Sequence, residues 1–139
     1  MRYQDETNGY VIKLSIDDEI QSSLTQFAAC ESIEAAHFWG IGAAKDIVLG
    51  SYDLQSKTYR KVEIAGVWEI ASLTGSLARA QDGPILHIHG VFSDEQCQTR
   101  AGHVFCLVCA ATVELFLVEL DPGLNRKYDE RTGLKLLDL

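Results

Sequence analysis

Three of the four histidines in this chain lie between residues 85 and 103. His87 and His89 are two positions apart in a run, residues 85–92, that is rich in β-branched and aromatic residues. In a β-strand, side chains two positions apart leave the same face, with their Cα atoms about 6.5–7 Å apart. That spacing lets two imidazole nitrogens reach one metal ion at about 2.0–2.1 Å each. The pair therefore predicts a metal site on one face of a strand.

His103 follows Gly102 and begins the next apolar run. If the two runs form a hairpin, His103 supplies a third nitrogen to the same site. Histidine is the commonest metal ligand in proteins, which favours this interpretation. A His-x-His pair also arises by chance, and the alternative is three partly buried histidines whose hydrogen bonds are satisfied within the protein. The spacing alone leaves both interpretations open.

Length and charge bound what the chain can do. It has 139 residues, 47% of them hydrophobic, and fits one domain over residues 1–139. Its formal net charge of −8 opposes contact with phosphate backbones unless the few cations cluster on one face. One short basic grouping exists, in which Arg126, Lys127 and Arg131 are interleaved with Asp129 and Glu130. We expect a solvated charged segment there rather than a nucleic-acid surface.

The apolar runs and the cysteines indicate the cellular compartment in which the protein is expected. The N-terminal segment lacks an apolar signal core, and the longest apolar run, residues 104–113, is too short to span a bilayer. Cys106 and Cys109 are three positions apart in a strand-like run, so their thiols point to opposite faces and cannot hold one ion. We interpret them as small buried hydrophobic residues. A soluble cytoplasmic protein with reduced thiols is expected, without a membrane partner.

One amphipathic helix and about eight strands are predicted. Asp18 is a candidate N-cap, with Gln21 in capping-box position and apolar residues at helical spacing, so a helix is expected over residues 19–30. Strands are expected at 10–16, 59–64, 66–77 (interrupted by Gly75) and 85–94. Two more are expected within 34–49, two within 104–120 and one in the tail after a turn at Pro122-Gly123. These elements indicate an α+β domain with a mostly antiparallel sheet.

The apolar strands exceed what one helix can cover, so a partner subunit is expected over the second sheet face. We expect residues 66–75 in that interface, with Ile70 at its centre. Trp68 and Tyr52 are large amphipathic side chains of the kind enriched in interfaces.

Several short stretches together match a known family over nearly the whole chain. They are Gly40-Ile41-Gly42-Ala43, residues 48–53, residues 69–75, His87-Ile88-His89, Ala101-Gly102-His103, Thr112-Val113-Glu114 and the tail from Arg126 to Leu137. With these stretches the chain resembles the plants-and-prokaryotes-conserved (PPC) domain. That domain follows the AT-hook in a set of plant nuclear proteins and stands alone in bacteria and archaea.

The resemblance implies a compact α+β subunit that assembles as a homotrimer. Prokaryotic members often hold zinc through three histidines, which correspond here to His87, His89 and His103. Where plant members have an arginine-aromatic pair, this chain has Val67-Trp68. It also lacks an AT-hook, and the net charge of −8 lends no support to direct DNA binding.

Three functions compete. The first is a metal-binding homotrimer with a regulatory role through DNA or protein partners, and we favour it. The second is a zinc-dependent enzyme of hydrolase or lyase type, which would use the open fourth position of a three-histidine site. Glu69 or Glu114 would then serve as general base or fourth ligand, although an ordinary strand carboxylate is the simpler interpretation of both. The third is a purely structural trimer with core histidines.

Overall fold

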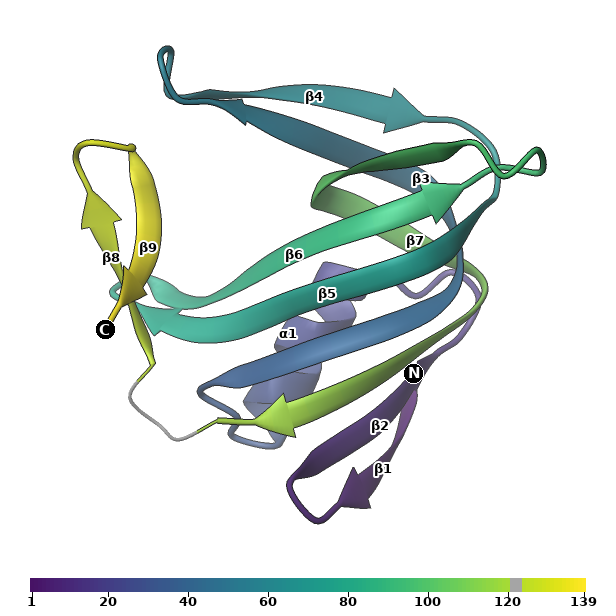
Figure 1. The fold of residues 1–139 in the computed structure, drawn as a ribbon. Helices are drawn as coiled ribbons and strands as arrows, with labels where there is room; N and C mark the ends of the chain where they lie inside the picture. Colours follow the sequence, from purple (N-terminus) through teal and green to yellow (C-terminus); the bar gives the residue numbers. More distant parts are fainter. Residues whose placement is uncertain (121–123) are drawn as a thin grey trace.

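The computed structural model describes residues 1–120 and 124–139 of the chain. These residues form nine strands and one helix (Figure 1). In chain order the elements are β1 (Arg2–Glu6), β2 (Gly9–Leu14), α1 (Ile20–Cys30), β3 (Ala36–Asp53), β4 (Thr58–Ile64), β5 (Trp68–Ala80), β6 (Gly83–Ser93), β7 (Thr99–Glu119), β8 (Asn125–Asp129) and β9 (Leu134–Asp138). The predicted turn at Pro122-Gly123 lies outside the described residues. No helix in the described part of the chain is long and apolar enough to cross a membrane.

Helix α1 forms as predicted but begins with a different cap. The side chain of Glu19 accepts hydrogen bonds from the backbone N–H groups of Gln21 and Ser22, which satisfies two donors that the first turn leaves unpaired. The predicted cap, Asp18, instead accepts from the N–H of Ser15 and pairs with the N-terminal ammonium group of Met1. The Asp18 prediction was therefore wrong, because these two partners occupy its carboxylate.

The sheet closes on itself around the core. Strand β3 pairs with β5, β5 with β6, β6 with β7, and β7 again with β3, all antiparallel. Strands β1 and β2 extend the sheet beyond β7, and β4 pairs with the second half of β3. The single parallel contact joins β5 to β8, so the described sheet is mixed rather than purely antiparallel. This circuit brings the ends of β6 and β7 side by side.

Strands β3 and β7 are each continuous, where two shorter strands were predicted. The register of β3 shifts between Gly40 and Gly42, so the predicted bulge is present, but the strand continues through it. Gly75 does not interrupt β5 either. A Cβ atom there would lie 2.7 Å from the carbonyl oxygen of His87, and the ring of Phe38 packs on the same side. Glycine at this position permits close packing instead of ending the strand.

Helix α1 covers one face of the sheet and leaves the other open (Figure 1). Its buried side chains, among them Leu24 and Phe27, join a core of strand residues, and each such side chain stabilises the fold by about 1.5–3 kcal/mol when fully buried. On the opposite face β3 and β7 present Trp39, Ile41 and Phe116, which are 45%, 54% and 39% exposed. We call Trp39, Ile41, Phe116 and Val118 the outer apolar face.

The residues that were predicted for the interface differ in their surroundings within the subunit. Ile70 is 2% exposed and belongs to the core of the subunit itself. Trp68 packs partly against that core, and the Tyr52 hydroxyl donates to the carbonyl oxygen of Thr132 within the same chain. The expectation that Ile70 is at the centre of an interface was wrong, because strand alternation turns its side chain inward.

Candidate metal centre

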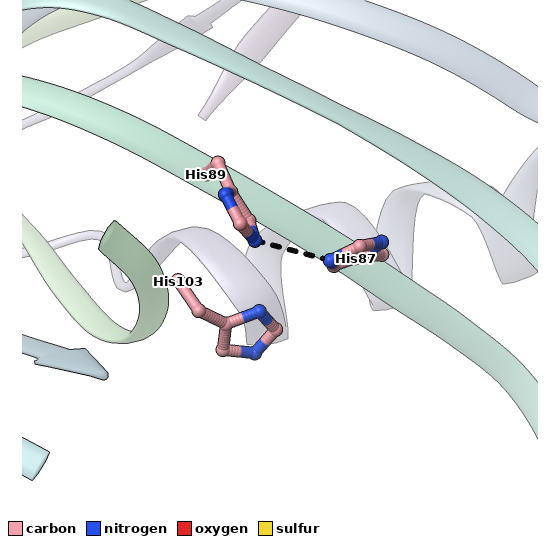
Figure 2. Close-up of side chains that lie close together, drawn as sticks. All are labelled: His87, His89 and His103. Carbon is pink, nitrogen blue, oxygen red and sulfur yellow. Dashed lines mark hydrogen bonds between the residues drawn. The ribbon is translucent and has the colours of Figure 1, made fainter. Parts of the chain in front are cut away.

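Strand β6 presents His87 and His89 on its outer face. Ile88 between them and Gly90 after them are buried, so the two histidines alternate with residues that face the core. Their Nε2 atoms lie 3.2 Å apart (Figure 2). The predicted sharing of one strand face by these two imidazoles is confirmed.

His103 joins the pair from the neighbouring strand. In the β6–β7 pairing, His103 lies directly opposite His89. Its ring centroid is 5.3 Å from that of His87 and 5.4 Å from that of His89. One nitrogen from each of the three rings lies within 4.8 Å of the others. The hairpin on which the third ligand depended is therefore present.

The donor set fits a divalent metal ion. Two nitrogens bound at about 2.0–2.1 Å in tetrahedral geometry stand about 3.3 Å apart, close to the observed 3.2 Å between His87 and His89. The Nδ1 atom of His103 is buried and has no hydrogen-bond partner among the described residues. Figure 2 shows a nitrogen of this ring facing the other two histidines. Three imidazoles are the ligands that zinc accepts while keeping a fourth position open.

The surroundings keep the imidazoles of His87 and His103 neutral. Burial, followed by the nearby His87, His89 and Lys61, lowers the pKa of His103 to about 4. Burial and then His89 and Arg126 lower the pKa of His87. Only the neutral ring can bind a metal. At neutral pH both rings are thus in the form that ligation requires.

Aromatic side chains hold His103 in place. Its ring centroid is 5.1 Å from that of Tyr59 and 4.7 Å from that of Phe105. Lys61 lies over the ring of Phe105, with its Nζ 3.9 Å from the ring centroid. Packing of this kind restricts the imidazole to one orientation, as a preorganised ligand requires.

Neither candidate carboxylate joins the cluster. The metal-capable group among the described residues consists of the three histidines. Glu69 pairs with Ser93, at the far end of β6 from His87, and Glu114 pairs with Ile41. A fourth protein ligand from either residue is not supported.

His37 lies on the same sheet face as the triad. In register it stands opposite Ser76, which in turn stands opposite His87. It lines a hollow of about 290 Å³ together with Thr74, Gly75, Ser76, His87 and His89. It is outside the three-histidine cluster, and we expect it to take no part in metal binding. The alternation of β3, in which Ala36 and Phe38 are buried, could have indicated this exposed position.

Arg126 was predicted to lie in a solvated segment, and no role at the site was expected for it. The structure half-buries its side chain beside the triad, in a second hollow that His87 and His103 also line. No signal in the local sequence distinguishes it from Lys127 and Arg131, because its place depends on how the β8–β9 hairpin packs.

The prediction of buried cysteines is confirmed for Cys109 and only in part for Cys106. All four are free, Cys109 is buried, and Cys106 on the other face is intermediate in exposure. They do not form a joint metal site within the described chain.

Comparisons with known proteins give consistent relatives. A structure described as a "Putative DNA-binding protein" from Ralstonia eutropha JMP134 is 28% identical, with a TM-score of 0.90 over 99% of this chain and 95% of the other. A plant- and prokaryote-conserved (PPC) protein of Pyrococcus horikoshii is 25% identical, with a TM-score of 0.89 over the same shares. A metal-containing protein of Archaeoglobus fulgidus is 28% identical, with a TM-score of 0.87 over 100% of this chain and 99% of the other.

A comparison with curated protein sequences finds no match. The family model of the Plants and Prokaryotes Conserved (PCC) domain matches residues 1–121, which is most of the chain. The long curved sheet, the single helix and the structural neighbours agree with that match. This chain belongs to the Plants and Prokaryotes Conserved domain family, abbreviated PCC or PPC.

Proposed function

We propose that this chain is a metal-binding PPC-domain protein that holds one zinc ion per subunit through His87, His89 and His103. One observation carries the proposal: three imidazole nitrogens from two paired strands lie within 4.8 Å of one another. The Nδ1 atom of His103 supports it, since it is buried and has no hydrogen-bond partner in the part of the chain that the structure describes. A buried polar atom without a partner is costly unless a ligand binds to it. The metal-containing relative from Archaeoglobus fulgidus adds further support. When bound, zinc would supply a Lewis-acidic open position, while the three imidazoles would hold the ion.

Elemental analysis tests this proposal directly. Protein purified without chelator or histidine tag is expected to carry close to one zinc per chain, and His89→Ala is expected to carry little. His37→Ala serves as the matched control, since it alters an exposed histidine of the same face and should leave the metal content unchanged. Well under one metal per three wild-type chains would refute the site.

The proposed assembly is a homotrimer built on the outer apolar face. Large exposed apolar patches on a soluble domain mark interaction surfaces. Trp39 and Phe116 stack there with ring centroids 5.8 Å apart, and both remain open to solvent in the single subunit. The three-fold symmetry comes from the family resemblance.

The proposed biological role is regulatory, through DNA or protein partners. A relative described as a "Putative DNA-binding protein" supports a link to DNA. The net charge of −8 argues that contact with DNA is weak or passes through a partner. We infer that protein partners carry the greater part of any such role.

A zinc-dependent hydrolase or lyase is the second candidate, and one observation favours it. The hollow of about 220 Å³ beside His87 and His103 could admit a small ligand next to the proposed ion. Zinc-loaded protein that hydrolyses 4-nitrophenyl acetate no faster than His89→Ala would count against this candidate.

A further inference from the structure

We propose that Arg126 and the three-histidine site together form a binding site for a short-chain carboxylate. The inference rests on the proposed zinc site and adds the class of ligand that it takes. The carboxylate head would lie between the guanidinium group and the histidines, and a short aliphatic body would lie in the adjoining hollow.

The hairpin of β8 and β9 carries Arg126 to the site. A hydrogen bond from the N–H of Arg79 to the carbonyl oxygen of Leu124 ties β8 to the edge of β5. At the other end of the hairpin, the Tyr52 hydroxyl donates to the carbonyl oxygen of Thr132 at 2.6 Å. The family model ends at residue 121, so it does not cover the tail that the sequence comparison had counted as similar to the family. Contacts at both ends thus fix the hairpin beside β6.

Two hydrogen bonds orient the guanidinium group. Its Nη1 donates to the carbonyl oxygen of Lys135 at 3.1 Å, and its Nη2 donates to the Oγ of Ser76 at 3.0 Å. A guanidinium group has five N–H donors in a planar fork. The remaining donors stay unused in the described chain, including the buried Nε–H. A fork with fixed orientation and free donors is suited to a planar oxyanion.

Among the described residues, the positive charge of Arg126 has no counter-ion. None of the ion pairs between described residues includes this side chain, whereas Arg79 pairs with Glu34 and Lys135 pairs with Asp82. Burial lowers the pKa of Arg126, which reflects the cost of keeping the cation partly out of water. A half-buried cation without an anion is unfavourable unless a ligand supplies one. With a divalent ion on three neutral imidazoles, two neighbouring positive centres would face the same hollow.

The shape of the hollow defines the rest of the ligand. Its volume is about 220 Å³. Arg126, His87 and His103 line its polar side together with Tyr59 and Lys135, and aliphatic side chains of β6 and β9 line the remainder. A site of this kind, apolar with a few converging polar groups, is typical of small-molecule binding. A carboxylate with a branched aliphatic body of a few carbons fits this hollow, because its head meets the polar lining and its body meets the aliphatic lining.

Calorimetric titration of the zinc-loaded protein tests the proposal. The probe is isovalerate, and isovaleramide is its neutral counterpart of nearly the same shape. We expect isovalerate to bind and isovaleramide to bind at least about tenfold more weakly, because a lost charge-assisted hydrogen bond costs roughly that much. Equal affinities of the two compounds, or no binding of isovalerate, would overturn the proposal without the need for any variant.

Two substitutions locate the effect. Arg126→Gln is expected to weaken isovalerate binding at least about tenfold while its zinc content stays that of wild type. Arg126→Lys should recover part of this loss, since it restores the charge without the planar fork. Arg79→Gln is the matched control, because it removes an arginine that pairs with Glu34 away from the triad and should leave binding unchanged.

The outcomes separate this inference from the proposed function. Normal zinc content with unchanged isovalerate binding in Arg126→Gln overturns the carboxylate site and leaves the metal site standing. Absence of zinc in the wild-type protein overturns the metal site and this inference with it. If Arg126→Gln dissociates the assembly and the wild-type protein ignores isovalerate, a carboxylate of a neighbouring subunit is the partner instead, and the proposal fails.

Discussion

His89 and His103 lie directly opposite each other across the β6–β7 pairing, so one metal ion bound to both would link two strands. Zinc is therefore expected to stabilise the folded chain. Free zinc at about 100 times its dissociation constant adds about 2.7 kcal/mol to the free energy of unfolding, which corresponds to several degrees in Tm. Differential scanning calorimetry with and without zinc measures the shift. His103→Ala should abolish it and His37→Ala should keep it, and a shift that persists in His103→Ala would place the metal elsewhere.

The lowered pKa of His103 predicts a pH dependence of stability in the metal-free chain. The side chain has a pKa of about 4 when folded and an ordinary value of 6.5. The unfolded chain therefore binds more protons between these two values, and the free energy of unfolding falls as the pH drops from about 6.5 towards 4.

His103→Phe isolates this effect, because a phenyl ring can still pack against Tyr59 and Phe105 but does not titrate. Urea unfolding with chelator present, at pH 7 and pH 5, compares the two proteins. Wild type should lose more stability than His103→Phe over this interval. Equal losses would show that His103 is not the responsible group.

Gly75→Ala is expected to destabilise the subunit by about 1–3 kcal/mol through overpacking. An added Cβ atom would lie 2.7 Å from the carbonyl oxygen of His87, and backbone at that position has little freedom to move. Because β6 must shift, the affinity for zinc should fall as well. Chemical denaturation and zinc titration measure both effects, with exposed Ser72→Ala as control. Wild-type stability in Gly75→Ala would mean that this contact relaxes freely.

Substitution on the outer apolar face is expected to break the assembly while leaving the subunit folded. Light scattering of the wild-type protein should give about three times the chain mass of 15.4 kDa. Trp39→Glu should give a smaller species with unchanged far-ultraviolet circular dichroism, because this side chain is 45% exposed in the subunit.

The control for this experiment is Leu54→Glu, at an apolar residue that is 65% exposed near the β3–β4 turn. It should leave the mass unchanged. Ile70→Asp should unfold the chain itself and not merely dissociate the assembly, since it places a charge in the subunit core. A monodisperse wild-type species near 15.4 kDa would rule out the trimer.

Direct binding to random duplex DNA is expected to be weak. Non-specific complexes depend on cations that displace counter-ions, and this chain carries 12 Lys and Arg residues against 20 Asp and Glu residues. Fluorescence anisotropy at ~150 mM salt should give a dissociation constant no tighter than about 10⁻⁶ M. A sub-micromolar value would contradict the prediction and indicate a basic surface formed by assembly.

Local patterns were enough to predict part of the site. The same-face placement of His87 and His89 follows from strand alternation, which depends only on neighbouring residues. The helix over residues 20–30 follows from apolar spacing in the same way, although its cap at Glu19 was misplaced by one residue because Asp18 has partners outside the helix. The ends of the strands were predicted least well. Strand β3 was expected to end near its glycines, but it continues past them through a bulge.

Tertiary structure alone decided the rest of the site. Arg126 and Ser76 are 50 positions apart, and their hydrogen bond exists because the β8–β9 hairpin packs against the edge of β5. His37 shares a sheet face with the triad because β5 pairs with both β3 and β6. Pairing between distant strands depends on the whole circuit of the sheet, and no periodicity in one segment encodes it. The placement of His87 and His89 could thus be predicted from their own strand, whereas the position of Arg126 beside them could not.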